Sequence, residues 1–288
     1  MSLSYNVYSY DIQLEKEFRT ASGTLSAKKT FFIQSKEEPN KVVELPLSPS
    51  MGFTSDVFVE LLLKDPETLS QSQLVKRMVS WLDADLSELA PAPSPLTIDF
   101  KTIGIGDEIP EKFDGVLKLK ADQSNYEQIA QLSYRLRDNH QLWSVDFNRG
   151  LRIEDLQKFY RTACMEKCFC IEQPLPVGQI DRGLIQELPI FFDEEMETLS
   201  FERCLEVRPA GLVLKTFRHS WAEYKSWHQF AIENKIPYFV GSMVQTEIAD
   251  ELCDQLNTKA PIQYFSRVQN LQTQSYLQDS QLLGEIKF

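Results

Sequence analysis

From residue 97 onward the chain alternates between short apolar runs and longer segments whose apolar residues recur at helical spacing. This regular alternation of strand and helix predicts a parallel sheet, because parallel strands need a crossover between them. The amphipathic segments predict helices at 126–138, 153–167, 221–235 and 246–256. The predicted fold class is therefore α/β over most of the chain.

Five of the apolar runs deliver a charged residue at or near their carboxyl end. The runs read GVLKLK (115–120), WSVDFN (143–148), CFCIEQP (168–174), PIFFDEE (189–195) and GLVLKTF (211–217). The charged residues that they deliver are Lys120, Asp146, Glu172, Asp193 and Lys215. Successive members are separated by the length of a strand, a helix and their loops, and a (β/α) barrel gathers strand-terminal side chains at its carboxyl-terminal face. The spacing therefore predicts a TIM barrel with an active site at that face.

The first part of the chain has a different pattern. Residues 4–47 contain β-branched and aromatic runs with turn residues between them, which predicts strands. Two polar segments, 18–29 and 48–56, are interpreted as loops. Helices are expected over 57–64 and 70–82. This region is therefore predicted to be an α+β domain.

A proline-rich segment, APAPSP (90–95), separates the two patterns. Proline at this density excludes regular structure, so we place a domain boundary there. The α+β domain would cover 1–95 and the barrel 96–256. The remaining segment, 257–288, would end the barrel and pack back on the first domain.

Composition narrows the possible functions mainly by exclusion. A net charge of −12 over 288 residues argues against a nucleic-acid partner, because phosphates require basic surfaces. No apolar stretch approaches the roughly 20 residues of a membrane span, and the N-terminal segment has no signal-like pattern. The five cysteines are an odd number, which favours a reducing compartment. We expect a cytoplasmic protein, monomeric or weakly homo-oligomeric, that acts on a small molecule and binds no membrane.

Three of the strand-terminal residues are carboxylates, which suggests a metal site. Asp146, Glu172 and Asp193 would converge from neighbouring strands, and their mutual repulsion requires protons or a metal ion. Oxygen-only ligands favour Mg²⁺ over zinc. The ion would bind a substrate carboxylate and stabilise the enediolate that forms when the adjacent C–H loses its proton. The predicted cofactor is Mg²⁺, and the predicted partner is a small-molecule carboxylate.

Lysines flank these carboxylates in the strand order. Side chains alternate along a strand, so Lys118 and Lys120 point to one side, as do Asp146 and Asn148. A lysine acts as a general base only as the neutral amine, which a neighbouring ammonium group and a dication favour. Lys120 is therefore the candidate base. Lys215 would face it as a second acid/base, or as a positive charge against an anionic or π-rich intermediate.

Each of these residues also has a simpler interpretation. A single strand-terminal Asp or Glu is commonly a helix cap or one half of a surface ion pair, and two lysines on a strand can form a solvated edge. For the whole set, five polar strand ends at barrel spacing would have to coincide. A zinc site at Cys164, Cys168 and Cys170 is disfavoured, because no CxxC pair is present. Three histidines are expected to be structural: His140, His219 and His228.

The order of these motifs along the chain is similar to that of a known family. LKLK, VDFN, IEQPLP, DEE and VLK, at these spacings, resemble the enolase superfamily. A lysine on each side places the chain with the muconate-lactonising-enzyme-like group, and within it the chain looks most like the o-succinylbenzoate synthases of menaquinone biosynthesis. FRTASGTLSAKKTFFI and PLSPSMGFTSD resemble that family's two specificity loops. The resemblance covers nearly the whole chain and implies a modified (β/α)7β TIM barrel with an α+β N-terminal capping domain.

The resemblance implies a role for each residue of the site. Asp146, Glu172 and Asp193 would bind Mg²⁺. Lys120 would remove the α-proton of 2-succinyl-6-hydroxy-2,4-cyclohexadiene-1-carboxylate (SHCHC). The protonated lysine would then assist departure of the hydroxyl group on the same face, a syn dehydration that gives o-succinylbenzoate. Lys215 would stabilise the intermediate by cation–π contact. The implied enzyme class is a carbon–oxygen lyase, a hydro-lyase.

Other residues would support the substrate and the ligands. Lys118 would tune Lys120, and Asn148 would support the ligand shell. Ser242 and Met243 would lie near the succinyl arm.

The two loops 18–29 and 48–56, with Ser22 and Phe53, would close over the mouth and exclude water. The sequence departs from the family at Ser144, where a larger side chain is expected, and after residue 256, where no clear eighth strand is visible.

A racemase of N-acyl amino acids or a dipeptide epimerase on the same scaffold is the alternative, because it needs the same lysines. A dipeptide epimerase would want an acidic group for the substrate's amino terminus near the last strands. Glu247 and Asp250 lie there, but they are expected to be helix-surface residues. A barrel without catalytic activity is a third interpretation, which the intact lysines and carboxylates disfavour.

Overall fold

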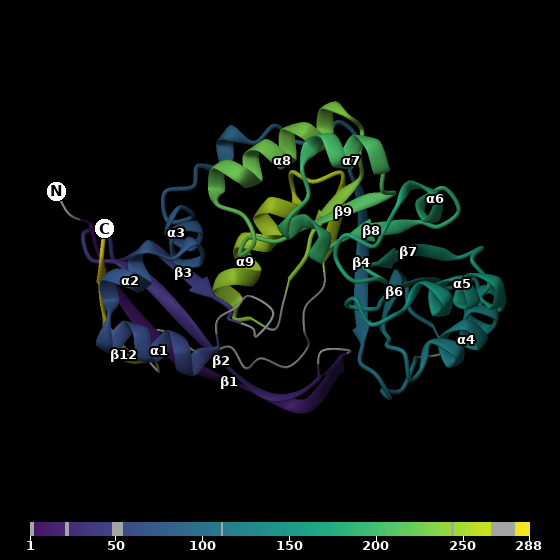
Figure 1. Ribbon diagram of the computed structural model, residues 1–288, viewed down its shortest axis with the longest axis horizontal. Helices are drawn as coiled ribbons and strands as arrows, with labels where there is room; N and C mark the ends of the chain where they lie inside the picture. The colour runs from purple at the N-terminus through teal and green to yellow at the C-terminus, as the bar shows by residue number, and fades with distance from the viewer. Residues whose placement is uncertain (1–2, 21–22, 48–53, 111, 243–244, 266–279) are drawn as a thin grey trace.

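The computed structural model describes residues 3–20, 23–47, 54–110, 112–242, 245–265 and 280–288. Within these ranges the strands form an antiparallel sheet, in the order β12-β1-β2-β3, and a parallel sheet, in the order β10-β9-β8-β7-β6-β5-β4-β11 (Figure 1). The parallel sheet is nearly closed and is surrounded by helices. The predicted fold, a TIM-type barrel with an α+β capping domain, is therefore confirmed.

The capping domain consists of the antiparallel sheet and a group of short helices. Its strands are β1 (Ser4–Thr20), β2 (Gly23–Ser35), β3 (Val42–Leu45) and the C-terminal β12 (Gln281–Lys287). Its helices are α1 (Ser55–Lys64), α2 (Pro66–Gln71) and α3 (Gln73–Val79). Because β12 pairs with β1, both ends of the chain lie at this end of the molecule (Figure 1).

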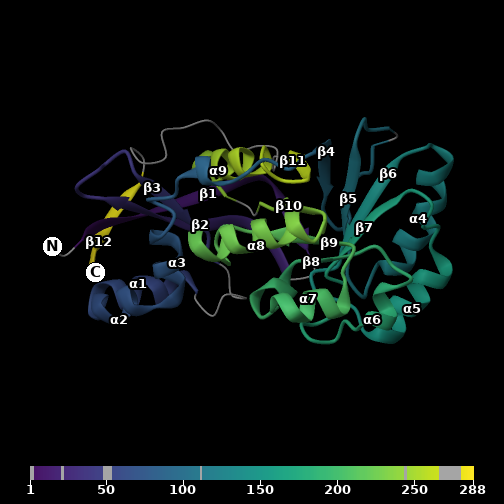
Figure 2. The same cartoon turned by 90° about the horizontal axis from the view of Figure 1, so that it is seen from above.

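The barrel follows in chain order. Its strands are β4 (Leu96–Ile103), β5 (Val116–Lys120), β6 (Leu142–Asp146), β7 (Cys168–Glu172), β8 (Ile190–Phe192), β9 (Gly211–Leu214), β10 (Tyr238–Val240) and β11 (Ile262–Phe265). Its helices are α4 (Tyr126–Asp138), α5 (Ile153–Thr162), α6 (Arg182–Ile185), α7 (Phe201–Val207), α8 (Trp221–Glu233) and α9 (Glu247–Asn257). They line the outside of the strands (Figure 2). The connection from β4 to β5 has no helix in its described residues, 104–110 and 112–115. No helix of the described ranges is long and apolar enough to cross a membrane.

Aromatic side chains form a small core cluster on the barrel strands. Phe100, Phe239 and Tyr264 come from β4, β10 and β11, and their ring centroids lie 4.5 to 5.9 Å apart. Phe191 of β8 joins them, 6.0 Å from Phe239. Gly211 makes room for this ring, because a Cβ atom there would lie 2.3 Å from Cζ of Phe191. These contacts join strands that are far apart in the sequence.

The capping domain contacts the barrel through α3 and the residues after it. The indole N–H of Trp81 donates to the backbone oxygen of His219 at 2.8 Å. The backbone N–H of Trp221 donates to Oγ of Ser80 at 2.9 Å. The Trp81 ring also lies 5.3 Å from the rings of both Trp221 and Tyr224. The turn between β9 and α8 is thereby fixed against the capping domain.

A buried carboxylate makes a second contact between the two domains. Glu44 of β3 is 2% exposed and accepts hydrogen bonds from the backbone N–H and hydroxyl of Thr246, at 2.8 and 2.6 Å. Its other oxygen accepts from the Thr30 hydroxyl at 2.7 Å. Thr246 is the N-cap of α9, so the Glu44 carboxyl group lies at a helix N-terminus, where burial raises its pKa and the hydrogen bonds from Thr246 oppose that rise.

Some local predictions were wrong. The helix expected over 70–82 is two helices, because Ser72 is extended and its hydroxyl caps α3 by accepting from Val75 N–H. The helix expected over 153–167 ends at Thr162, where Ala163 turns to an extended conformation.

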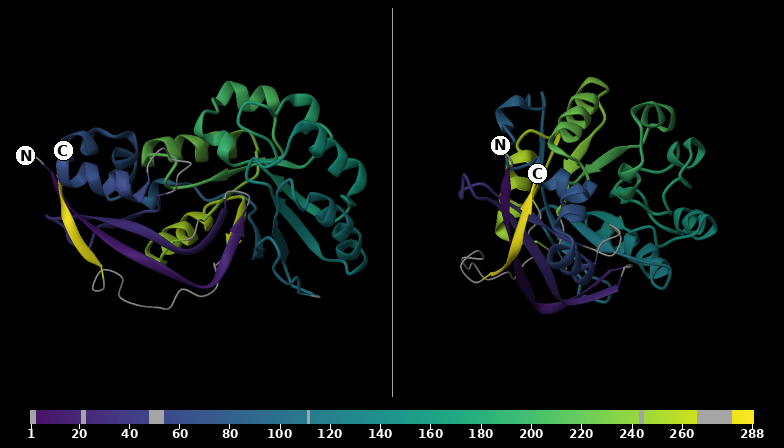
Figure 3. Two further views of the ribbon diagram at one scale, coloured as in Figure 1. Left: turned by 60° about the horizontal axis from the view of Figure 1, so that its bottom comes forward. Right: turned by 60° about the vertical axis from the view of Figure 1, so that its left-hand side comes forward.

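The segment 18–29, predicted as a loop, lies largely in β1 and β2. The cross-strand pairs Phe18–Leu25, Arg19–Thr24 and Thr20–Gly23 continue the hairpin. The hairpin extends from the capping sheet toward the barrel (Figure 3), where the N–H of Ile105 donates to the oxygen of Arg19 at 3.0 Å. Of the second predicted loop, residues 54–56 begin α1 and residues 48–53 lie outside the described part of the chain.

Candidate active site

β5 and β6 place the first group of charged side chains. Their parallel register sets Lys118 beside Ser144 and Lys120 beside Asp146. The apolar residues of β5 are buried, so this strand is held by the core while its lysines extend toward the site. Lys120 is the last residue of β5, and Asp146 is the last residue of β6.

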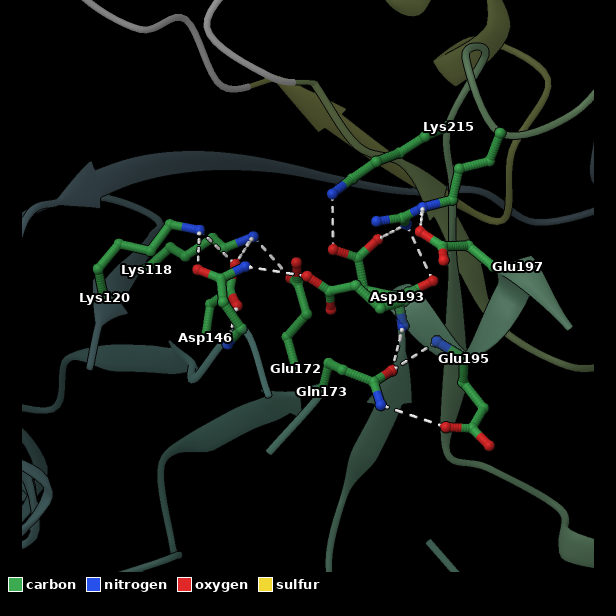
Figure 4. A network of polar contacts seen from close by, with 12 residues as sticks. Lys118, Lys120, Asp146, Glu172, Gln173, Asp193, Glu195, Glu197 and Lys215 are labelled. Carbon is green, nitrogen blue, oxygen red and sulfur yellow. Dashed lines mark hydrogen bonds and ion pairs between the residues drawn. The ribbon is translucent and has the colours of Figure 1, made fainter. Parts of the chain in front are cut away.

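The two lysines of β5 converge on the same oxygen. Nζ of Lys120 lies 2.5 Å from Oδ2 of Asp146, and Nζ of Lys118 lies 3.1 Å from that atom (Figure 4). Lys118 also donates to Oε2 of Glu172 at 2.6 Å. Lys120 donates to Oδ1 of Asn148 at 3.1 Å. The structure therefore brings together five of the residues that the sequence singled out.

A second group lies past the ends of β8 and β9. Asp193 is fully buried and accepts from Nζ of Lys215 at 2.6 Å through Oδ2. Its Oδ1 accepts from Nη1 of Arg218, which also donates to the backbone oxygen of Asp193 at 2.9 Å. Arg218 was not among the predicted residues. The basic residues of KTFRH (215–219) are evident in the sequence, but the pattern does not indicate that this arginine contacts Asp193.

Gln173 fixes the main chain around Asp193. Its side chain is fully buried, and Oε1 accepts from the backbone N–H groups of Asp193 and Glu195 at 3.1 and 2.9 Å. Its Nε2 donates to the oxygen of Leu175 at 3.0 Å. The backbone of Gln173 has a φ of +34°, a conformation that non-glycine residues rarely adopt and that recurs at functional sites. Gln173 lies within the motif IEQPLP, but the sequence pattern indicates no role for it.

Glu194 adds a fourth carboxylate, which sequence reasoning did not single out. It is 6% exposed, and its Oε1 accepts from Nδ2 of Asn148 at 3.4 Å. Its Oε2 has no hydrogen-bond partner among the residues that the structure describes. Burial and the neighbouring Asp193 charge raise the pKa of Glu194. A cation or a water molecule in the site would find an acceptor here.

Burial and neighbouring charges act differently on the three predicted ligands. Burial favours the neutral acid, but the Lys120 and Lys118 ammonium groups hold the pKa of Asp146 well below its usual range. Burial also opposes ionisation of Asp193, whose pKa is kept low by Arg218 and Lys215. For Glu172, burial and then the Asp146 charge raise the pKa to about 8. Glu172 is therefore the ligand candidate that most readily holds a proton.

The carboxylates of the site are chemically suited to a hard divalent cation, but lysine ammonium groups contact their oxygens. Within the described ranges, no three His, Cys, Asp or Glu side chains are grouped closely enough to hold one ion. Lys118 instead bridges Asp146 and Glu172. However, Oε1 of Glu172 is buried and receives no hydrogen bond from the described residues. Buried oxygens that lack a donor are what an oxygen-coordinated ion would satisfy.

The predicted substrate contacts are only partly within the described residues. Ser242 follows β10 and is half-buried. Met243, Ser22 and Phe53 lie outside the described part of the chain. Next to Ser242, Gly241 packs against Lys215, because a Cβ atom there would lie 3.0 Å from Cε of that lysine.

The histidines and cysteines make contacts outside this group. His219 is buried, and burial lowers its pKa to about 4. Nδ1 of His228 lies 2.5 Å from the hydroxyl of Tyr238, and His140 follows Asn139, the C-cap of α4. All five cysteines are free. Among the described residues, Cys164, Cys168 and Cys170 belong to no group of side chains that could hold a metal ion.

Searches for related proteins found likeness in structure but not in sequence. No family model and no curated protein matches the chain. A dipeptide epimerase from Enterococcus faecalis V583, solved with Mg and L-Leu-L-Tyr, has a TM-score of 0.72 at 15% identity, over 96% of this chain and 93% of its own. A muconate lactonizing enzyme from Pseudomonas fluorescens, complexed with muconolactone, has a TM-score of 0.70 at 14% identity, over 90% of this chain and 86% of its own. An N-succinyl Arg/Lys racemase from Bacillus cereus ATCC 14579 has a TM-score of 0.70 at 12% identity, over 92% and 87%.

These structural neighbours are members of the enolase superfamily. At such low identities the likeness establishes the fold alone, a parallel barrel with an N-terminal capping domain. Fold alone does not determine the reaction, which must be argued from the site.

Proposed function

We propose that the chain is a Mg²⁺-dependent lyase that converts SHCHC to o-succinylbenzoate by syn dehydration, as its motifs imply. The observation that carries the proposal is the placement of lysines on both sides of three buried carboxylates. Lys118 and Lys120 approach from β5, and Lys215 approaches from the end of β9 (Figure 4). A substrate bound between them would have an amine or ammonium group on each side of its reacting carbon.

The three carboxylates are the residues that would hold the ion. Asp146, Glu172 and Asp193 offer oxygen ligands from β6, β7 and the end of β8. When bound, Mg²⁺ supplies positive charge that stabilises the enediolate form of a substrate carboxylate. The backbone N–H of Asn148 donates to Oδ1 of Asp146 at 3.0 Å and its side-chain amide donates to Oε1 of Glu194 at 3.4 Å, so Asn148 would support the set.

In this proposal Lys120 carries the proton through the reaction. Its neutral amine would take the α-proton of SHCHC, leaving the C–H electron pair in the enediolate. That electron pair then forms the new ring double bond as the C–O bond to the hydroxyl group breaks. The Lys120 ammonium returns its proton to the departing hydroxyl, so the products are water and the aromatic ring. Asn148 Oδ1, 3.1 Å from Nζ, would orient the amine, and Lys215 would face the ring as a cation.

A racemase or epimerase is the second candidate, because dipeptide epimerases and an N-succinyl Arg/Lys racemase share the fold. The lysines on the two sides would then act as alternate proton donor and acceptor. A free dipeptide also brings an ammonium group, which needs an acidic partner when it is buried.

The acidic groups near the last strands lie chiefly in the first turn of α9. Described residues 241–242 and 245–246 contain no Asp or Glu, whereas Glu247 and Asp250 in that turn are half-buried. Asp250, in the first turn of α9, accepts from Nε2 of Gln245 at 2.9 Å. Glu44, which reaches this region from the capping domain, has both oxygens engaged by threonines. Because Asp250 and Glu44 are already engaged, we take N-acyl amino acids as the stronger form of the alternative, and Glu247 is the acidic group that a dipeptide would need.

One assay separates the candidates. Purified protein with Mg²⁺ is mixed with SHCHC, and the absorbance change that accompanies aromatisation is followed. Fast conversion that a chelator abolishes is the expected result. Absence of conversion, together with α-proton exchange of N-acyl amino acids or dipeptides in D₂O, would refute the synthase and support the racemase or epimerase.

A further inference from the structure

Arg218 contacts Asp193 more extensively than any role in the proposed reaction requires. Its side chain is 7% exposed, and its guanidinium lies 5.3 Å from the centroid of the Phe217 ring. Nη1 donates to both Oδ1 and the backbone oxygen of Asp193. Nε lies 3.4 Å from Oε1 of Glu197, at the end of the turn that begins with Asp193. One nitrogen of the guanidinium group therefore holds both the side chain and the main chain of Asp193, while Nε lies beside the following turn without a hydrogen bond to the described residues.

Asp193 is held on its other side as well. Its backbone N–H donates to Oε1 of Gln173 at 3.1 Å, while its backbone oxygen accepts from Arg218 at 2.9 Å. The peptide groups on both sides of Cα are thus fixed. Of the two carboxylate oxygens, Oδ1 faces the planar guanidinium, and Oδ2 faces the flexible side chain of Lys215 at 2.6 Å.

This arrangement leaves one oxygen of Asp193 free to change its partner. Lysine is a mobile point charge, whereas the planar guanidinium of Arg218 is fixed in place, because the Nη1 that binds Oδ1 also donates to the backbone oxygen of Asp193. Oδ2 can therefore exchange Lys215 for another cation while Oδ1 stays with Arg218. A carboxylate held in this way offers a single oxygen to a metal ion.

Offering one oxygen rather than two distinguishes between divalent cations. Mg²⁺ demands near-ideal octahedral geometry with short bonds, whereas Ca²⁺ takes more oxygens and accepts bidentate carboxylates. We propose that Arg218 is a positioning residue that restricts Asp193 to one coordinating oxygen and so biases the site toward Mg²⁺ over Ca²⁺. The inference rests on the proposed function only in taking Asp193 as a metal ligand.

The test measures binding of the metals alone. Mg²⁺ and Ca²⁺ are titrated separately into the full chain by calorimetry, without substrate, for the wild type, Arg218→Met and Arg218→Lys. Arg203→Met is the matched control, because its ion pair with Glu206 lies on the surface of α7. Loss of a group that orients a metal ligand costs about 10–100-fold in metal affinity, so we expect the preference for Mg²⁺ to fall about tenfold in Arg218→Met. Arg218→Lys keeps the charge without the planar guanidinium, and we expect it to restore only part of the preference.

The inference is overturned if the Mg²⁺/Ca²⁺ preference stays unchanged in both variants, including the case in which the affinity for both ions falls equally. If thermal unfolding of the metal-free protein shows that Arg218→Met does not fold, Arg218→Lys decides alone, and wild-type preference in that variant refutes the role of the guanidinium group. SHCHC turnover by the wild type is measured separately. Turnover together with an unchanged preference would support the proposed function and refute only the role of Arg218. A shifted preference without turnover would support the role of Arg218 and refute the proposed function.

Discussion

The two sides of the barrel mouth position their charged groups by different means. On the β5–β6 side, Lys120 and Asp146 are the last residues of their strands, and the parallel register sets them side by side. On the β8–β9 side, Asp193 lies just past its strand, and Gln173 and Arg218 hold it from other elements. The first side is set by strand geometry, whereas the second depends on buried hydrogen bonds between segments that are distant in the sequence.

This difference predicts how each side responds to substitution. A side chain at a strand end can be changed while the strand keeps its ladder of backbone hydrogen bonds. Removing a partner from the β8–β9 side instead leaves buried polar groups unpaired, which costs stability as well as function. Substitutions on the two sides should therefore separate chemistry from folding.

The largest expected effect is on catalysis, from Lys120→Met on the strand-borne side. The substitution keeps the length of the side chain but removes the amine, so turnover should fall by about 10²–10⁴-fold, the usual contribution of a general acid/base. Mg²⁺ binding by calorimetry and the circular dichroism spectrum should stay close to wild type. Lys158→Met, which removes the exposed ion pair with Glu127, is the control. Retained turnover in Lys120→Met would show that another group carries the proton.

On the other side, Gln173→Leu should damage folding and metal binding together. Leucine has a similar volume but leaves the buried N–H groups of Asp193 and Glu195 without their acceptor. Each unsatisfied group costs about 1–3 kcal/mol, so the free energy of unfolding should fall by roughly 2–5 kcal/mol. Denaturant unfolding measures this loss. Gln157→Leu on the exposed face of α5 should change little. A stable Gln173→Leu protein with weakened Mg²⁺ binding would mean that Gln173 only orients Asp193.

The same comparison explains which residues the sequence could predict. Lys118, Lys120, Asp146 and Glu172 lie in strands whose apolar pattern is local, so the alternation of side chains along each strand is enough to predict that they lie together. Gln173 and Arg218 could not be found this way, because their partners depend on how the turns after β7, β8 and β9 fold against each other.

Elements that depend on tertiary contacts were also hard to predict. β11 is short and pairs with β4, more than 150 residues earlier in the chain, so no local sequence pattern indicates this strand. The hairpin over 18–29 was predicted as a loop from its Ser, Thr and Gly content, and cross-strand pairing overrode that tendency. In contrast, the strand–helix alternation that predicted the barrel is local and repeats along the chain.

A smaller effect is expected from Gly241→Ala, which tests how Lys215 is positioned. The new Cβ atom would lie 2.6 Å from Cγ1 of Val213 and 3.0 Å from Cε of Lys215, so the lysine must shift. Overpacking of this kind costs about 1–3 kcal/mol, and a displaced Lys215 should lower kcat by about tenfold. Gly284→Ala in β12 is the control, because its Cβ would meet Leu62 at an ordinary 3.5 Å. Unchanged kcat in Gly241→Ala would remove Lys215 from the rate-limiting step.

The smallest expected effect concerns Glu172, which lies between the two sides on β7. Its pKa is raised to about 8 in the folded protein, chiefly by burial and then by the Asp146 charge. Between its ordinary pKa and about 8 the folded state holds a proton that the unfolded state has lost, so stability falls as pH rises through this range. Metal-free wild type should therefore lose unfolding free energy from pH 5 to pH 8. Glu172→Gln, which cannot ionise, should flatten that slope in denaturant unfolding at the two pH values. An equally steep slope in Glu172→Gln would assign the pH dependence to other groups and leave Glu172 ionised in the folded protein.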